Sequence, residues 1–117
     1  MTPLPEIDSE TRTGSDAVTL DCYVPATLPH FAGHFPGMPI LPGVVQIDWA
    51  VRLAARYFAL PAGFRALDNI KFLAVVLPDT RLQLALKFDG TRKRLSFAYT
   101  SAARTFSSGH IVFDAEP

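Results

Sequence analysis

The sequence predicts an α+β domain in which a curled antiparallel sheet wraps around one long central helix. Two observations carry this prediction. Residues 43–60 are the only segment with helical hydrophobic periodicity, and the segments that follow alternate like strands. The helical segment is apolar on almost every side, so it must be buried, and a curled sheet buries it in a two-layer domain. The length of 117 residues suits one such domain.

The chain before the helix is expected to supply a loose lead, one strand and a long loop. Residues 1–16 are polar and contain prolines, so we expect a loosely ordered lead ahead of a single domain of residues 17–117. Residues 17–24 alternate between apolar and polar side chains, which predicts a strand. Residues 25–42 hold five prolines, which excludes helix and strand. A loop of that length in a compact domain generally serves a function.

The helix and the later strands are expected to form the core. Pro61 and Gly63 end the helix, and strands are expected at residues 65–76, 81–88, 93–100 and 105–113. We expect an apolar row of the helix to pack against a row of leucines on the second of these strands. The two rows are Val44, Ile47 and Val51 on the helix and Leu82, Leu84 and Leu86 on the strand. The edge strands of such a sheet invite pairing with a second copy.

Charge and composition argue against several classes of function. Eleven Lys and Arg residues balance eleven Asp and Glu residues, so no long-range field attracts nucleic acid. The N-terminus has neither a basic region nor an apolar core, so we expect no signal peptide. No apolar run approaches the roughly 18 residues that span a bilayer. Cys22 is the only cysteine, so no disulfide can form within the chain, and a soluble cytoplasmic protein is expected.

The loop and the start of the helix carry the residues suited to chemistry. His34 lies among glycines and prolines that hold the loop stiff, which is a good placement for a general base. Gly43 opens the helix, where the first backbone N–H groups have no intrahelical partner, and it has no side chain to keep a thioester carbonyl away. Asp48 follows about one and a half turns later among apolar neighbours, where a carboxyl stays protonated more readily and can act as an acid. These three groups could remove an α-proton from a thioester and expel a β-hydroxyl as water.

The same segment resembles a known family. The matching residues are His34, Phe35, Pro36, Gly37, Pro39, Pro42, Gly43 and Val44, with Asp48 fourteen positions after His34. They are similar to the signature of β-hydroxyacyl-acyl carrier protein dehydratases of the FabA/FabZ type. Weaker similarity continues through residues 70–72 and 76–79, so the resemblance covers residues 30–113. Residues 46–49, Gln-Ile-Asp-Trp, are similar to the short dehydratases of aryl-polyene biosynthesis clusters.

The resemblance implies a fold, an activity and partners. It implies a hot-dog fold without metal or organic cofactor, and dehydration of 3-hydroxyacyl groups on acyl carrier protein to trans-2-enoyl thioesters. It also implies a homodimer whose sites straddle the interface, with His34 of one chain as base and Asp48 of the other as acid. Gly43 would polarise the thioester carbonyl through its N–H. The residues that would shape the site are Phe35, Pro36, Gly37 and Pro42.

One departure from the family pattern leaves alternative functions open. Arg52 stands where the family usually has glutamine, four residues after Asp48, and an ion pair between them would work against the acid role. One alternative is therefore a non-catalytic subunit that partners a second hot-dog protein. Another is a hot-dog acyl thioesterase, because one fold can host several reactions.

The remaining candidate residues are expected to be structural. His30 and His34 are spaced like a metal pair only if they lie on a helix, which this loop excludes, and His110 is expected to be a structural strand residue. Residues 92–94, Arg-Lys-Arg, are most simply a solvated turn. The alternative is that this turn, or Arg52 with Arg56, docks an acidic carrier protein.

Overall fold

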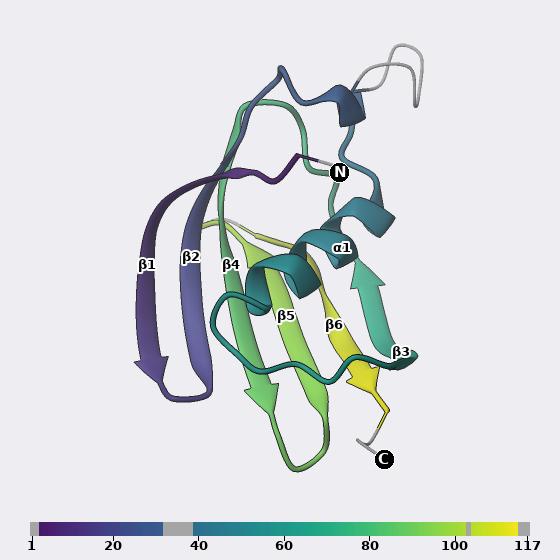
Figure 1. The fold of residues 1–117 in the computed structure, drawn as a ribbon. Helices are drawn as coiled ribbons and strands as arrows, with labels where there is room; N and C mark the ends of the chain where they lie inside the picture. The colour runs from purple at the N-terminus through teal and green to yellow at the C-terminus, as the bar shows by residue number, and fades with distance from the viewer. Residues whose placement is uncertain (1–2, 32–38, 103, 115–117) are drawn as a thin grey trace.

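The computed structural model describes residues 3–31, 39–102 and 104–114. In these residues six antiparallel strands form one sheet, and one α-helix lies against a face of it (Figure 1). The elements are β1 (Glu6–Gly14), β2 (Ala17–Val24), the 3₁₀ turn η1 (Pro29–Phe31), α1 (Gly43–Ala54), β3 (Phe64–Phe72), β4 (Thr80–Asp89), β5 (Arg94–Thr100) and β6 (Thr105–Phe113). The strand order is β1-β2-β4-β5-β6-β3, so β1 and β3 are the edges of the sheet.

The first strand is a correction to the prediction of a loose lead. Residues 6–14 pair with β2 along their length, from Glu6 opposite Tyr23 to Gly14 opposite Ala17. Their side chains are almost all exposed, so no apolar alternation marks the strand in the sequence. The strand forms because its backbone groups complete the ladder of β2, and hydrogen bonding of that kind leaves no hydropathy signal.

The helix is shorter than predicted and turns a different face to the sheet. It ends at Ala54, and residues 55–58 continue as turns with three-residue hydrogen bonds such as Tyr57 N to Ala54 O. Val44 was expected in the core but is 72% exposed. The buried face carries Gln46, Trp49, Ala50, Leu53 and Ala54. A helix that is apolar almost all round does not specify which side meets the sheet.

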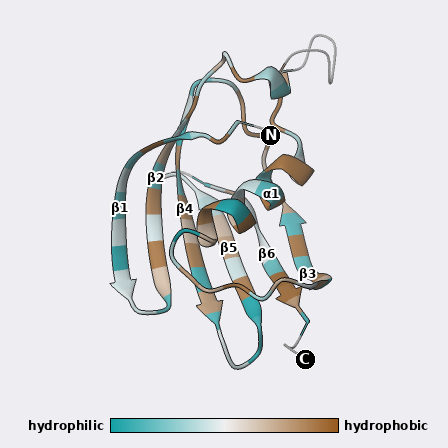
Figure 2. Cartoon of the chain, viewed as in Figure 1, coloured by the Kyte–Doolittle hydropathy of each residue, from teal (hydrophilic) through white to brown (hydrophobic). Residues whose placement is uncertain are grey.

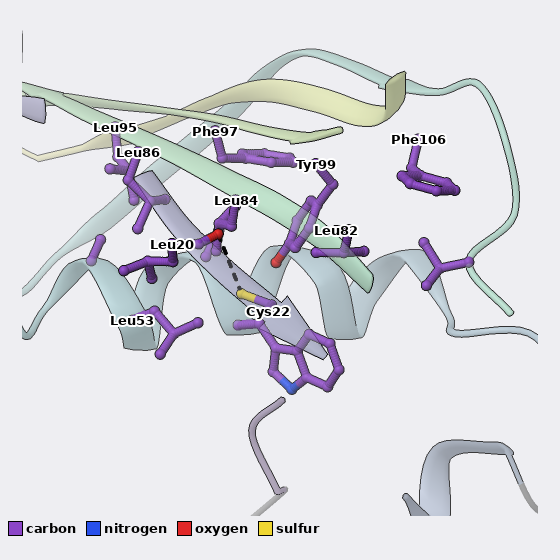
Figure 3. Close-up of a cluster of buried hydrophobic side chains, with 14 of the residues drawn as sticks. Leu20, Cys22, Leu53, Leu82, Leu84, Leu86, Leu95, Phe97, Tyr99 and Phe106 are labelled. Carbon is purple, nitrogen blue, oxygen red and sulfur yellow. Dashed lines mark hydrogen bonds between the residues drawn. The ribbon is translucent and has the colours of Figure 1, made fainter. Parts of the chain in front are cut away.

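The strand side of the core is as predicted. Leu82, Leu84 and Leu86 are at most 4% exposed and point toward the helix, as Figure 3 shows for a cluster that also includes Leu20 and Tyr99. Hydrophobic and hydrophilic residues alternate along β2 and β4, because successive strand side chains point to opposite faces (Figure 2). No helix in the described part of the chain is long and apolar enough to cross a membrane.

Cys22 belongs to this core. It is 2% exposed, and its Sγ lies 3.7 Å from the Leu20 carbonyl oxygen (Figure 3). Burial raises the pKa of the Cys22 thiol to about 12, because a thiolate would lose its hydration there.

Candidate active site

The start of α1 presents backbone donors that nothing in the helix uses. Pro42 is the N-cap and makes no side-chain capping hydrogen bond. Its carbonyl oxygen accepts from Val45 N at 3.1 Å and Gln46 N at 3.3 Å. In a trans peptide the N–H points away from the preceding carbonyl, so the Gly43 N–H points out of the helix end. This is the geometry needed to receive an oxygen that gains negative charge.

A pocket of about 340 Å³ lies against this helix end. It is lined by Ile40, Leu41, Pro42, Gly43, Gln46, Phe72, Ala74 and Val75. Most of these side chains are apolar, so a bound carbonyl oxygen would meet little competition from water and its interaction with an N–H would be strengthened. The pocket therefore combines an apolar wall with a backbone donor.

Phe72, at the end of β3, brings its ring directly over Gly43. A Cβ built on Gly43 would lie 2.5 Å from Phe72 Cζ, which is closer than real contacts allow. Asn69, with φ of 52°, lies in a bulge of β3 between Asp68 and Lys71 that alters the register just before Phe72. The sequence indicated Phe72 as a residue that could affect pocket depth, but it did not place the ring over Gly43. Glycine at 43 is what permits this close packing.

Asp48 lies on the same helix but in a more open setting than predicted. Its side chain is 46% exposed, and its Oδ2 accepts a hydrogen bond from Arg52 Nη1 at 3.2 Å. The apolar neighbours expected around the carboxyl point elsewhere, since Trp49 faces the core with no exposed surface. The prediction that apolar neighbours in this chain bury the Asp48 carboxyl is therefore wrong. The ion pair with Arg52 that the sequence allowed is present.

The predicted base and most of the predicted site loop lie outside the described residues. These are His34, Phe35, Pro36 and Gly37. The flanks of the loop are described, and both attach to the segment between β3 and β4. At the loop entrance, Asp79 Oδ1 accepts from the Tyr23 hydroxyl at 2.6 Å and from Ala26 N at 3.1 Å. At the exit, Leu41 N donates to the Val76 carbonyl at 2.8 Å.

These contacts also affect ionisation at the loop entrance. The hydrogen bond from Tyr23, followed by that from Ala26 N, lowers the pKa of Asp79 because both stabilise the carboxylate. The same bond raises the pKa of Tyr23, since the neutral hydroxyl is the donor. Asp79 itself adopts φ of 61°, a left-handed conformation that aspartate tolerates in turns.

A buried polar group links the pocket to the sheet. Gln46 is 3% exposed, its Nε2 donates to the Leu41 carbonyl at 3.3 Å, and its Oε1 accepts from Ser107 Oγ at 2.6 Å. The Tyr99 hydroxyl donates to the Gln46 backbone carbonyl at 2.6 Å. Burial raises the pKa of Tyr99 well above its usual value. Sequence analysis missed this network, and the only signal for it was a glutamine within an apolar helix.

The other candidate residues lie away from the pocket. The His30 ring packs edge-on against Trp49 with ring centroids 5.9 Å apart, and His110 Nδ1 lies 2.8 Å from Ser96 Oγ. Arg94 lies in register with Val112, whereas Phe72 is in register with Ser107 at the other end of β6. The basic turn at residues 92–94 is therefore at the opposite end of the sheet from Gly43 (Figure 1).

Comparison with known proteins identifies the family of this chain. A family model described as ApeI-like, ApeI dehydratase, matches residues 9–110. The chain belongs to this family. Among solved structures, this ApeI-like chain is similar to a chain of the ApeI:P dehydratase heterocomplex from Xenorhabdus doucetiae. It is 30% identical, with a TM-score of 0.88 over 97% of this chain and all of that chain. An uncharacterized protein from Erwinia carotovora subsp. atroseptica is 34% identical, with a TM-score of 0.76 over 97% of both chains. The predicted hot-dog fold is thereby confirmed.

The resemblance to FabZ-type dehydratases is confirmed as well. A 3-hydroxyacyl-[acyl-carrier-protein] dehydratase FabZ from Syntrophobacter fumaroxidans is 32% identical over 119 residues, which cover 95% of this chain and 75% of that protein. FabZ from Aliivibrio fischeri is 33% identical over 97 residues, which cover 75% of this chain and 63% of that protein. The matched segments therefore cover a smaller share of each FabZ relative than of this ApeI-like chain.

Proposed function

We propose that the chain dehydrates 3-hydroxyacyl thioesters, carried on acyl carrier protein, to trans-2-enoyl thioesters. The observation that carries the proposal is the Gly43 N–H, which has no hydrogen-bond partner among the described residues and lies at an apolar pocket, in a member of the ApeI-like dehydratases. An enolate-like transition state concentrates negative charge on the thioester oxygen. A preorganised donor stabilises that charge, and one such donor contributes roughly 3 kcal/mol in the oxyanion hole of an acyl-transfer enzyme.

The elimination uses a base, a donor and an acid. His34 takes the C2 proton of the substrate, the released electron pair forms the C2–C3 double bond, and the C3–O bond breaks. The hydroxyl leaves as water with a proton from Asp48, while the Gly43 N–H holds the carbonyl oxygen. His34 and Asp48 then exchange their protons with solvent, so the net products are the enoyl thioester and water. The chain's own groups account for every proton in this sequence.

Acyl carrier protein is the proposed donor of the substrate because the FabZ relatives are named for it. Of the two candidate basic patches we favour Arg52, in the last turn of α1, with Arg56, in the turn that follows it, because residues 92–94 lie at the far end of the sheet from Gly43. An acidic carrier would be steered by such charges. The free, buried thiol of Cys22 accords with a reducing compartment, and we place the enzyme in the cytoplasm.

The test is turnover of a 3-hydroxyacyl carrier protein, followed by the loss of one water by mass spectrometry and by the absorbance of the conjugated product. His34→Ala is expected to abolish turnover, whereas His110→Ala, which changes a histidine outside the pocket, is expected to retain it. A His34→Ala variant as fast as the wild type would refute the assignment. Release of free thiol, detected with a chromogenic thiol reagent, would instead indicate the thioesterase alternative.

We further propose that two copies pair along β3. This strand is an edge of the sheet, and large apolar side chains are exposed on β3, on the segment of residues 73–77 that follows it and at the start of α1. They are Val44, Phe64, Leu67, Phe72, Leu73, Val75 and Leu77. An exposed apolar edge strand pairs readily with another chain, and such pairing would cover the Asp48 face of the helix next to Val44. The expected mass in solution is that of a dimer, and Leu67→Lys is expected to give a monomer.

The ion pair between Asp48 and Arg52 favours a second candidate function, that of a non-catalytic subunit in a heteromeric dehydratase. The solved relative from Xenorhabdus doucetiae is described as a heterocomplex. In this case the purified chain would be inactive alone and would gain activity only with a second hot-dog protein. Arg52→Gln separates the two functions. A catalytic chain should keep turnover when Asp48 loses this ion pair, whereas a non-catalytic chain stays inactive.

A further inference from the structure

We propose that Gln46 is a positioning residue that holds the backbone before α1 so that the Gly43 N–H meets the substrate carbonyl. The inference rests on the dehydration proposed above. Gln46 faces the core, and its side-chain amide nitrogen and oxygen form hydrogen bonds with two different parts of the fold. The amide nitrogen donates to Leu41, in the chain leading to the helix, and the amide oxygen accepts from Ser107 on β6.

Gln46 borders the pocket, but both of its side-chain amide atoms are hydrogen-bonded within the protein and are not available to a substrate. The residue is 3% exposed, and Ser107 is completely buried. Each amide atom has a partner within the protein, and no buried side-chain polar atom among the described residues lacks one. A primary amide in an apolar core costs free energy unless both its ends are hydrogen-bonded. A residue used in this way organises backbone rather than binding ligand.

Several hydrogen bonds hold Leu41 and Pro42, the two residues before the Gly43 N–H donor. The Leu41 N–H is held by Val76 at 2.8 Å, and the Leu41 carbonyl is held by Gln46 at 3.3 Å. Pro42 follows with φ of −60°, a value that its ring enforces. Its carbonyl is bound by the first turn of α1. No peptide group from Leu41 to the Gly43 N–H is therefore free to rotate without breaking a hydrogen bond.

Ser107 ties the Gln46 amide to β6, and the Leu41 carbonyl sets the orientation of that amide. The Ser107 hydroxyl donates at 2.6 Å to Oε1, and a flipped amide would place its oxygen against the Leu41 carbonyl, which can only accept. Ser107 is also in register with Phe72, whose ring covers Gly43. The start of the helix is thus tied to the same point of β6 that carries the opposite wall of the pocket.

The matched experiment compares Gln46→Met with Tyr99→Phe on the full-length protein. Methionine keeps the length of glutamine but loses both amide hydrogen bonds. Phenylalanine at 99 loses the hydrogen bond to the Gln46 backbone and leaves the bond to Leu41 in place. We expect Gln46→Met to lower kcat by about 10- to 100-fold with KM within about 2-fold, because small misplacements of a catalytic group cost rates of this order. Tyr99→Phe is expected to keep kcat within about 2-fold while lowering the Tm.

Gln46→Glu provides a second variant with a pH readout. A protonated carboxyl can accept from Ser107 and donate to the Leu41 carbonyl, as the amide does, whereas a carboxylate cannot donate. Burial raises the pKa of a carboxyl at such a site, so the change should fall between about pH 6 and pH 9. We expect the ratio of variant to wild-type kcat to fall as pH rises. Tyr99 and Cys22, the nearby titratable groups in the core, stay neutral over this range.

The outcomes separate the two proposals. If the wild type is active and both Gln46 variants keep its kcat at about pH 9, the positioning role is overturned. An equal fall in kcat for Tyr99→Phe and Gln46→Met would also overturn it, since general loosening of the core would then explain both. If the wild type does not dehydrate, the proposed function fails. The positioning role is then decided by the backbone amide NMR shifts of Leu41 and Gly43, which Gln46→Met must move and Tyr99→Phe must not.

Discussion

Gly43→Ala would place one methyl group where the structure leaves room for none. The added Cβ would lie 2.5 Å from Phe72 Cζ and 2.8 Å from Cε1, so the ring must swing away. Phe72 is 51% exposed, and its far end can move at little cost. Gly43 has no left-handed φ, so alanine strains no backbone, and its better helix propensity gains up to about 1 kcal/mol. We therefore expect the free energy of unfolding to stay within about 1 kcal/mol of the wild type.

Activity should respond far more strongly than stability. The methyl group projects into the pocket beside the N–H and keeps the thioester oxygen out of hydrogen-bonding distance. Loss of one such donor costs about 10²- to 10³-fold in kcat. The assay is enoyl formation from a 3-hydroxyacyl carrier protein, and thermal unfolding is measured on the same samples. A kcat within about 3-fold of the wild type would refute the donor role of Gly43.

The double variant Gly43→Ala, Phe72→Ala controls for the displaced ring. It removes the clash but leaves the methyl group beside the N–H. If the double variant is as slow as Gly43→Ala, the methyl group itself blocks the carbonyl. Recovery of activity would instead show that the rate loss came from the moved Phe72 ring, and the role of Gly43 would then be to accommodate that ring.

Three further predictions follow from ionisation and burial. Asp48→Asn should lower kcat by about 10²- to 10⁴-fold with an unchanged fold, checked by the same enoyl assay, and unchanged turnover would exclude Asp48 as the acid. Asp79 has a lowered pKa in the folded chain, so its contribution to stability is present above the ordinary carboxyl pKa and is lost as pH falls through the folded value, below about pH 4. Tyr23→Phe should reduce that acid loss in a series of Tm measurements, and an identical pH dependence would contradict the assigned cause. The Cys22 thiol, with its pKa raised to about 12 by burial, should resist a maleimide at about pH 8 until the chain is denatured.

The parts of the fold that could be predicted are those with strong side-chain periodicity. Leu82, Leu84 and Leu86 alternate with polar residues, and period-two alternation over a long run has one physical explanation, a strand with one buried face. Strand β1 could not be predicted in this way, because its side chains are exposed and its stability comes from backbone pairing with β2. The buried face of α1 was not predictable either, because Val44 and Leu53 are equally apolar and only the sheet distinguishes them.

The features of the candidate site also divide into those that the sequence predicts and those that only the tertiary structure determines. The sequence by itself determined that glycine opens the helix, that proline precedes it and that Asp48 and Arg52 lie one helical turn apart, because these follow from neighbours in the chain. Only the tertiary structure decided that Phe72 covers Gly43, that Asp79 holds the loop entrance and that Gln46 reaches both Leu41 and Ser107. These contacts join residues far apart in the chain, and their partners are set by strand register and by the rotation of the helix, which no local pattern encodes.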